Sequence, residues 1–313
     1  MVVSQKIPLK PGVYAATLTF FDENEDLDLA TLRAHITRLA KSGLSGIVAL
    51  GSNGEAAHLS TEERQLVTTT VRDTLNQEGY QSLPVIVGAS AASTRECIKR
   101  CHEAAEAGGS HVLVLPPSYF KVAMSPDVIK KFYSTVADAS PLPVIIYSFP
   151  AVVNDIHMSS ELIIQISQHP NIVGTKFTCG DSGKLARVAR AMHSSIDGGY
   201  WAVGGLADFT LQTMIAGGSG VVAGGANLAP KICTRIVELF KRREFDEAMR
   251  LQAILATGDG IHTAAGIGAT KAVLQRYFSY GGAPRLPLTI PLVQVMDNVY
   301  SGVAEMMELE KSL

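Results

Sequence analysis

Short apolar runs rich in valine, isoleucine and leucine recur along the chain, and each is followed by a longer segment whose apolar residues share one helical face. This alternation is typical of buried parallel strands joined by crossover helices. The predicted strands are Gly12–Phe21, Gly46–Gly51, Val85–Ser90, His111–Pro117, Pro143–Ser148, Ile172–Phe177, Gly199–Gly205 and Gly217–Gly225. The chain therefore contains eight strand and helix units.

Helix signals fall between these runs. Ser60–Gln77 opens with Ser-Thr-Glu-Glu, in which Ser60 and Glu63 have the spacing of a capping box. Other helices are expected to begin near Leu27, Ser93, Ser125, Ser159, Gly183, Asp208 and Ala229. Three further helical stretches follow the eighth unit, at Glu244–Ala256, Thr263–Phe278 and Ile290–Glu310.

Eight units favour a closed (β/α)8 TIM barrel, because closure is what an eightfold repeat achieves. An open doubly wound sheet is the alternative, but no G-x-G-x-x-G turn follows the first strand. We expect residues 1–242 to form the barrel with its active site, and residues 243–313 to form C-terminal helices packed on the barrel. These helices are expected to contribute to an oligomer surface.

Composition narrows the classes of partner. The chain is 47% hydrophobic and 18% charged, which excludes disorder. Its net charge is -2 and its basic residues are scattered, which argues against nucleic acid and anionic membrane as partners. The four cysteines lack C-x-x-C spacing, and we find no signal peptide or membrane span. We expect a cytoplasmic protein that binds small molecules and copies of itself.

Function in a barrel gathers at the carboxyl ends of the strands. The second strand ends in Gly51-Ser52-Asn53-Gly54-Glu55, where we expect the two glycines to permit a tight turn with N–H groups directed at one spot. Such a turn suits a carboxylate, although Gly-Ser-Asn-Gly also makes ordinary turns. The sequence leaves both interpretations open.

Lys176 is the sharpest candidate for chemistry, because it ends the apolar run of the sixth strand and should point into the barrel or its mouth. Burial disfavours the ammonium form of an amine, and a neutral amine can attack a carbonyl. The alternative is a buried lysine paired with a structural carboxylate. Glu55 is the only acidic residue at the neighbouring strand ends.

Two tyrosines are candidate proton relays. Tyr147 lies at the end of the fifth strand, next to the sixth in barrel order, so its hydroxyl is expected within reach of Lys176. Tyr119 follows the fourth strand and is a second candidate. For both, packing of the ring in the core is the alternative.

These residues resemble the dihydrodipicolinate synthase and N-acetylneuraminate lyase family of class I, pyruvate-dependent aldolases, over nearly the whole chain. The resemblance implies that the Gly51–Glu55 turn holds the pyruvate carboxylate, that Tyr147 relays protons and that Lys176 forms the Schiff base. It also implies that Tyr119 is lent across a dimer interface and that the backbone at Val222 touches pyruvate. Relatives resemble tetramers built from dimers, so a homodimer or homotetramer is expected.

One departure bears on the substrate. Dihydrodipicolinate synthases resemble one another in an arginine two residues after the Tyr-x-x-Pro proline, where this chain has Val152. An isopropyl group cannot grip a carboxylate as a guanidinium does. The segments Gly51–Glu55 and Thr175–Gly180 look more like those of 4-hydroxy-2-oxoglutarate aldolases and of fungal 2-keto-3-deoxy-sugar-acid aldolases.

The sequence therefore predicts a lyase that cleaves a 2-keto-3-deoxy sugar acid or 4-hydroxy-2-oxoglutarate through an imine on Lys176. The products are pyruvate and an aldehyde, which is glyoxylate for the second substrate. No metal or organic cofactor is required. The alternatives are a dihydrodipicolinate synthase, a metal-dependent aldolase, disfavoured because the histidines are scattered, and a non-catalytic sensor of 2-oxo acids.

Overall fold

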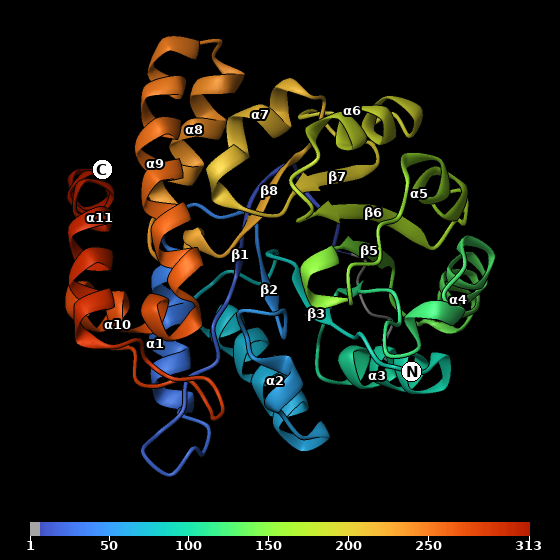
Figure 1. The fold of residues 1–313 in the computed structure, drawn as a ribbon, viewed down its shortest axis with the longest axis horizontal. Helices are drawn as coiled ribbons and strands as arrows, with labels where there is room; N and C mark the ends of the chain where they lie inside the picture. The colour runs from blue at the N-terminus through green and yellow to red at the C-terminus, as the bar shows by residue number, and fades with distance from the viewer. Residues whose placement is uncertain (1–6) are drawn as a thin grey trace.

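Eight parallel strands close into a barrel in the computed structural model, which describes residues 7–313 (Figure 1). Each strand pairs with the next along the chain, and β8 pairs with β1. The strands are β1 Gly12–Ala16, β2 Gly46–Ala49, β3 Val85–Gly88, β4 His111–Val114, β5 Val144–Ser148, β6 Ile172–Phe177, β7 Trp201–Gly204 and β8 Gly220–Ala223. The predicted closed barrel is confirmed, and the open sheet is wrong.

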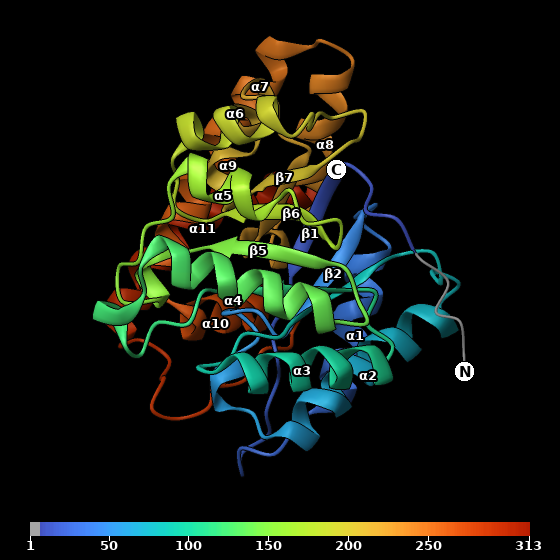
Figure 2. The same ribbon diagram turned by 90° about the vertical axis from the view of Figure 1, so that its right-hand side faces the viewer.

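Helices follow the strands around the outside of the barrel (Figure 2). They are α1 Leu29–Ala40, α2 Thr61–Gln77, α3 Thr94–Glu106, α4 Pro126–Ala139, α5 Ser160–Ile166, α6 Ser182–Ala191, α7 Thr210–Ile215 and α8 Pro230–Lys241. The predicted capping box of α2 is present, with Ser60 and Glu63 bonded reciprocally. Within residues 7–313, no helix combines the length and the apolar character needed to traverse a bilayer.

Most strands are shorter than their apolar runs. β1 ends at Ala16 instead of Phe21, and β8 begins at Gly220 instead of Gly217. Apolar side chains remain buried after ladder pairing has stopped, as Leu18 and Phe20 are each only 1% exposed beyond the end of β1. Hydrophobicity reports burial, so it overestimates the hydrogen-bonded part of a strand.

Three helices after the barrel complete the chain: α9 Phe245–Ala265, α10 Ile267–Phe278 and α11 Val293–Ser312. α9 continues past Ala256, where the prediction ended it, and includes Gly258. α11 packs along α9 (Figure 1), and a methyl group at Gly258 would lie 2.6 Å from Met306 Sδ. This glycine therefore serves close helix packing. The division at residue 242 stays a prediction.

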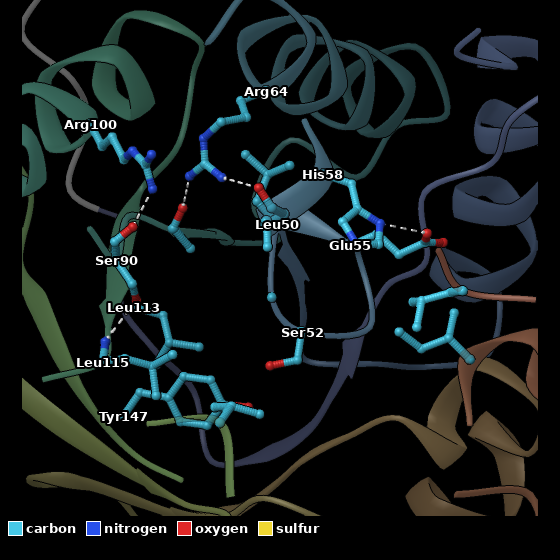
Figure 3. Close-up of a pocket in the computed structure, with 17 residues that line it drawn as sticks. Leu50, Ser52, Glu55, His58, Arg64, Ser90, Arg100, Leu113, Leu115 and Tyr147 are labelled. Carbon is cyan, nitrogen blue, oxygen red and sulfur yellow. Dashed lines mark hydrogen bonds and ion pairs between the residues drawn. The ribbon is translucent and has the colours of Figure 1, made fainter. Parts of the chain in front are cut away.

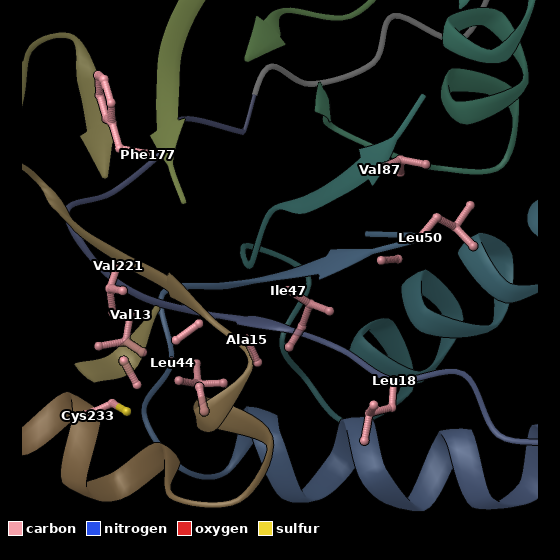
Figure 4. Packing of buried hydrophobic residues seen from close by; sticks show 14 of the residues in the cluster. Val13, Ala15, Leu18, Leu44, Ile47, Leu50, Val87, Phe177, Val221 and Cys233 are labelled. Atoms are coloured by element: carbon pink, nitrogen blue, oxygen red, sulfur yellow. The ribbon is translucent and has the colours of Figure 1, made fainter. Parts of the chain in front are cut away.

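Two apolar layers surround the strands. Outward-facing residues such as Val13, Ile47 and Val221 pack against the helices (Figure 4). The barrel interior is filled by Tyr14, Ala16, Val48, Ile86, Leu113, Ile145, Tyr147, Trp201, Val203 and Val222. Tyr14 and Trp201, the only tryptophan of the chain, meet edge to face with their ring centroids 4.8 Å apart. The Tyr14 hydroxyl donates to Lys10 O, so this pair closes the amino-terminal end of the barrel.

α11 also caps α8, which has no side-chain cap of its own. The Glu310 carboxylate accepts hydrogen bonds from the backbone N–H groups of Lys231, at 3.1 Å, and Ile232, at 3.0 Å. Burial raises the pKa of Glu310 to about 7, and these two hydrogen bonds lower it in part. We expect Glu310→Ala to lower the free energy of unfolding by about 1–2 kcal/mol, because the two donors lose their acceptor. Urea denaturation measures this loss.

The raised pKa also predicts a pH dependence. Burial favours the protonated form of the Glu310 carboxyl in the folded protein. Relative to the unfolded chain, the folded state therefore gains stability below the ordinary pKa of 4.5, and this gain is lost as the pH rises through about 7. Such a shift corresponds to at most about 3 kcal/mol. We expect Glu310→Gln, which stays neutral, to reduce the decline in the thermal midpoint between pH 5 and pH 8. An unchanged pH profile in this variant would contradict the expectation.

Candidate active site

The fifth and sixth strands bring Tyr147 and Lys176 together. The two residues are direct partners in the β5–β6 ladder, so both side chains point to the barrel interior. Lys176 Nζ lies 3.2 Å from the Tyr147 hydroxyl and 4.4 Å from its ring centroid. Lys176 is 3% exposed and Tyr147 4%. The proximity expected from barrel order is therefore present.

Among residues 7–313, no carboxylate lies within 4 Å of Lys176 Nζ. Glu55 was the acidic residue that the sequence offered as a partner. Its Oε1 instead lies 2.7 Å from Nζ of Lys271, a different buried lysine on α10. The structural ion pair thus belongs to Lys271, and Lys176 keeps an amine without a counter-ion.

The turn after β2 differs in detail from the expectation. Its left-handed residues are Leu50, with φ 57°, and Glu55, with φ 51°, and the two glycines do not supply the positive φ angles. Gly54 packs closely against the end of β1, since a methyl group there would lie 3.2 Å from Thr17 O. A methyl group at Gly51 would meet no atom within 4 Å. Gly51 therefore leaves open space beside the backbone, where a ligand can approach.

A cavity of about 420 Å³ opens at the carboxyl end of the barrel (Figure 3). Gly51, Ser52 and Tyr147 line it, so the structure brings three of the predicted site residues to one space. Its other walls are mainly apolar and include Leu113, Leu115, Ile267 and Leu288. Tyr147 lines this cavity and also accepts the hydrogen bond from Lys176 Nζ. Lys176 itself does not line the cavity, and its amine contacts the Tyr147 hydroxyl.

The remaining predicted residues lie around this centre. Val222 packs in the barrel interior in the same cluster as Tyr147. Asn53 does not line the cavity, and its Nδ2 would lie 2.5 Å from a methyl group at Gly224, just after β8. Tyr119 lies outside the cavity, is 79% exposed and stacks edge to face on Phe120. Within one chain, Tyr119 therefore does not join Tyr147 and Lys176.

Two arginines that lie on helices, and not at strand ends, also border the cavity. Arg64 on α2 donates to the backbone oxygens of Ala56 and Gly88, and Arg100 on α3 donates to that of Ser90 (Figure 3). Burial and the nearby Arg100 charge lower the pKa of Arg64 to about 10. Both guanidinium groups bind backbone at or after the strand ends, so the shape of the cavity depends on side chains of α2 and α3.

Two hydroxyl groups near the end of the β5–β6 pair were also missed. Ser148 Oγ and Thr178 Oγ1 are buried and have no hydrogen-bond partner among the described residues. Thr178 lies two residues after Lys176, just past the end of β6, so continuing the alternation of the strand by one step would have pointed to it. In residues 7–313, no three His, Cys, Asp or Glu side chains are grouped to hold a metal ion.

Comparison with known proteins places this geometry in a family. The family model described as "Dihydrodipicolinate synthetase family" matches residues 10–302. This chain belongs to the dihydrodipicolinate synthetase family. Membership confirms the resemblance that the Gly51 turn, Tyr147 and Lys176 indicated.

Within the dihydrodipicolinate synthetase family, similar curated proteins are fungal aldolases. The chain is 46% identical to the L-threo-3-deoxy-hexylosonate aldolase of Aspergillus niger, with 98% of each chain covered. It is 48% identical to an Emericella nidulans protein named "Probable 4-hydroxy-2-oxoglutarate aldolase, mitochondrial", again with 98% of each covered. A crystal structure of a family protein from Coccidioides immitis matches with a TM-score of 0.86 at 33% identity, covering 99% of this chain and 100% of that one.

Proposed function

We propose that the protein is a class I aldolase that cleaves 2-keto-3-deoxy sugar acids to pyruvate and an aldehyde. The observation that carries the proposal is the buried amine of Lys176, which lies 3.2 Å from the Tyr147 hydroxyl and has no carboxylate counter-ion in the part of the chain that the structure describes. A desolvated amine beside a phenol has the nucleophile and the proton relay that imine chemistry needs. The fungal aldolases that resemble the chain along its whole length support the same reaction.

The reaction begins when Lys176 Nζ attacks the C2 carbonyl of the 2-oxo acid; the Tyr147 hydroxyl gives up its proton as water leaves, so that a protonated imine and the Tyr147 phenolate remain. The C4 hydroxyl then gives its proton to the Tyr147 oxygen, and the C3–C4 bond breaks. The electron pair of that bond moves toward the imine nitrogen, so an aldehyde leaves and an enamine remains. The enamine takes a proton at C3 from the Tyr147 hydroxyl, and water then releases pyruvate and the free amine while a proton returns to Tyr147.

The Gly51–Glu55 turn fits the carboxylate of the substrate. Gly51 and Ser52 line the cavity beside Tyr147, and the open space at Gly51 lets an anion approach backbone N–H groups. Asn53 and Gly54 do not line the cavity; Asn53 packs beside Gly224, Gly54 packs beside Thr17, and Val222 belongs to the barrel interior. We keep 4-hydroxy-2-oxoglutarate, which would give glyoxylate and pyruvate, as the second candidate substrate, because the Emericella nidulans relative bears that name.

Trapping with borohydride tests the reaction class. Reduction in the presence of pyruvate should fix pyruvate irreversibly to the peptide that contains Lys176, as read by mass spectrometry. The same experiment in a chelator should give the same adduct, because no metal is proposed.

A panel of 2-keto-3-deoxy acids separates an aldolase from a sensor of 2-oxo acids. A sensor would bind pyruvate but would release no aldehyde from any acid of the panel. A coupled dehydrogenase measures the pyruvate that an aldolase releases. The panel also separates the two candidate substrates.

Val152 leads to a prediction about substrate. Its side chain lines the cavity and is 45% exposed, so it offers an apolar wall where a synthase would present a guanidinium. We expect Val152→Arg alone to leave dihydrodipicolinate formation below about 1% of the lyase rate, because a bidentate grip also needs correct placement of the fork. A reductase-coupled assay with pyruvate and aspartate semialdehyde measures this. Efficient synthesis by the unmodified protein would contradict the substrate assignment.

We propose that the protein acts as a homodimer or homotetramer. The aromatic pair Tyr119 and Phe120, together with Val122, is largely exposed on the loop after β4, which supports an interface at which Tyr119 enters the partner's site. Analytical ultracentrifugation tests the assembly.

We propose that the protein is located in the cytoplasm. The free cysteines fit a reducing compartment. One relative is named as mitochondrial, so microscopy of a fluorescent fusion protein is the experiment that distinguishes the two compartments.

A further inference from the structure

The pair formed by Glu55 and Lys271 has no part in the mechanism above. Lys271, on α10, is fully buried, and its Nζ lies 2.7 Å from Glu55 Oε1 and 3.1 Å from Ala283 O. The two charged residues are 216 positions apart in the chain. One of the C-terminal helices thus reaches the turn that follows β2.

Glu55 ends that turn, and both of its carboxylate oxygens are held by the C-terminal part of the chain. Oε1 accepts from Lys271, and Oε2 accepts from the backbone N–H of Arg285 at 2.9 Å. Its carboxylate is turned toward His58 on the side of the cavity away from Tyr147 (Figure 3). Glu55 therefore belongs to the turn that borders the cavity, while its carboxylate binds Lys271 and the backbone of Arg285.

Arg285 strengthens the same connection. Its guanidinium forms two hydrogen bonds with Glu63 of α2, at 2.9 and 2.7 Å, and a third with His58 O at 2.9 Å. The segment from Glu55 to Glu63 is thereby attached at both ends to residues 271–285. A bidentate pair of this kind fixes orientation as well as position.

Backbone conformation makes this attachment matter for the site. Glu55 has a left-handed φ of 51°, which is unfavourable for a residue with a Cβ and persists only when its surroundings impose it. Gly51 and Ser52, which line the cavity, stand at the other end of the same five-residue turn. Burial lowers the pKa of Lys271 and the Glu55 carboxylate raises it in part, so each charge relies on the other.

We propose that Lys271 is a positioning residue: through its ion pair with Glu55 it holds the Gly51–Glu55 turn in the geometry that binds the carboxylate of the 2-oxo acid. The C-terminal helices then set the affinity for substrate, while Lys176 and Tyr147 carry out the bond chemistry. This inference rests on the proposed function, because it assigns the turn to the substrate carboxylate.

The test compares Lys271→Met, Glu55→Gln and the double variant with the unmodified protein. Lys184→Met is the matched control, because Lys184 on α6 is also largely buried and lies 3.9 Å from Asp181. For each protein, kcat and KM are measured on a 2-keto-3-deoxy acid, together with the pyruvate concentration that gives half-maximal borohydride trapping on Lys176. The thermal midpoint is recorded alongside.

We expect Lys271→Met and Glu55→Gln each to raise KM and the half-maximal pyruvate concentration by on the order of 10-fold, with kcat at saturation changed by less than about 3-fold. The double variant should recover part of the loss, because no unpaired charge stays buried. Lys184→Met should leave both quantities unchanged.

Unchanged KM and unchanged half-maximal trapping in Lys271→Met and Glu55→Gln, with or without a lower thermal midpoint, would overturn the proposal, since they would show a purely structural pair. If Lys271→Met fails to fold, Glu55→Gln gives the decision by itself. If the unmodified protein forms no adduct with pyruvate, the proposed function fails instead. A normal adduct in the unmodified protein with unshifted trapping in the variants rejects only the role of Lys271.

Discussion

Lys176→Met is expected to lower kcat for cleavage by at least about 10³-fold, because the variant has no amine to form the imine. Methionine keeps the unbranched shape of the side chain, and the amine of Lys176 has no carboxylate partner to lose within residues 7–313. The fold should therefore be kept, and removal of a buried polar group should leave the thermal midpoint unchanged or higher. Steady-state release of pyruvate and circular dichroism measure the two expectations.

The control for this variant is Lys184→Met, which removes another lysine that is largely buried. It should retain activity and the borohydride adduct, whereas Lys176→Met should lose both. Activity of Lys176→Met within about 10-fold of the unmodified protein would contradict imine catalysis at this residue. A lost adduct with retained cleavage would point to a different nucleophile.

Tyr147→Phe carries the second large expected effect. The variant keeps the ring that fills the barrel interior but removes the hydroxyl 3.2 Å from Lys176 Nζ. General acid and base steps by a positioned side chain contribute about 10²–10⁴-fold, so kcat should fall by that amount. The adduct with pyruvate should still form, only more slowly, because the amine remains. Quenched-flow trapping separates slow imine formation from slow bond cleavage.

Tyr14→Phe is a suitable control, because it also removes a phenol hydroxyl from the barrel interior. The Tyr14 hydroxyl bonds Lys10 O at the opposite end of the barrel, so its loss should affect stability and leave kcat unchanged. If both variants lowered kcat equally, general disturbance of the barrel would explain the loss, and the relay role of Tyr147 would be rejected.

The barrel and its central pair could be predicted because their signals are local. Eight apolar runs at regular spacing require eight buried strands, and the order of strands in a barrel makes Tyr147 and Lys176 neighbours. Lys176 was conspicuous because a charged residue ended an apolar run. Val152, which the resemblance to synthases singled out, also lines the cavity.

The rest required the three-dimensional structure. Glu55 pairs with Lys271, which lies 216 positions away in the sequence, and no local pattern around either residue indicates the ion pair. Arg64 and Arg100 reach the cavity from α2 and α3, whereas the barrel architecture directs attention to the strand ends. α9 continues past its predicted end through Gly258, where the absence of a side chain leaves room for Met306 of α11. Such contacts depend on how elements pack, which periodicity does not encode.

The position of Trp201 has a practical consequence. Because the chain has one tryptophan and it lies inside β7, emission excited at the indole band reports the barrel interior alone. Helices α9 to α11 contribute to far-ultraviolet ellipticity but not to that emission. Comparing the two optical transitions during denaturation therefore reveals whether the C-terminal helices come apart together with the barrel or before it.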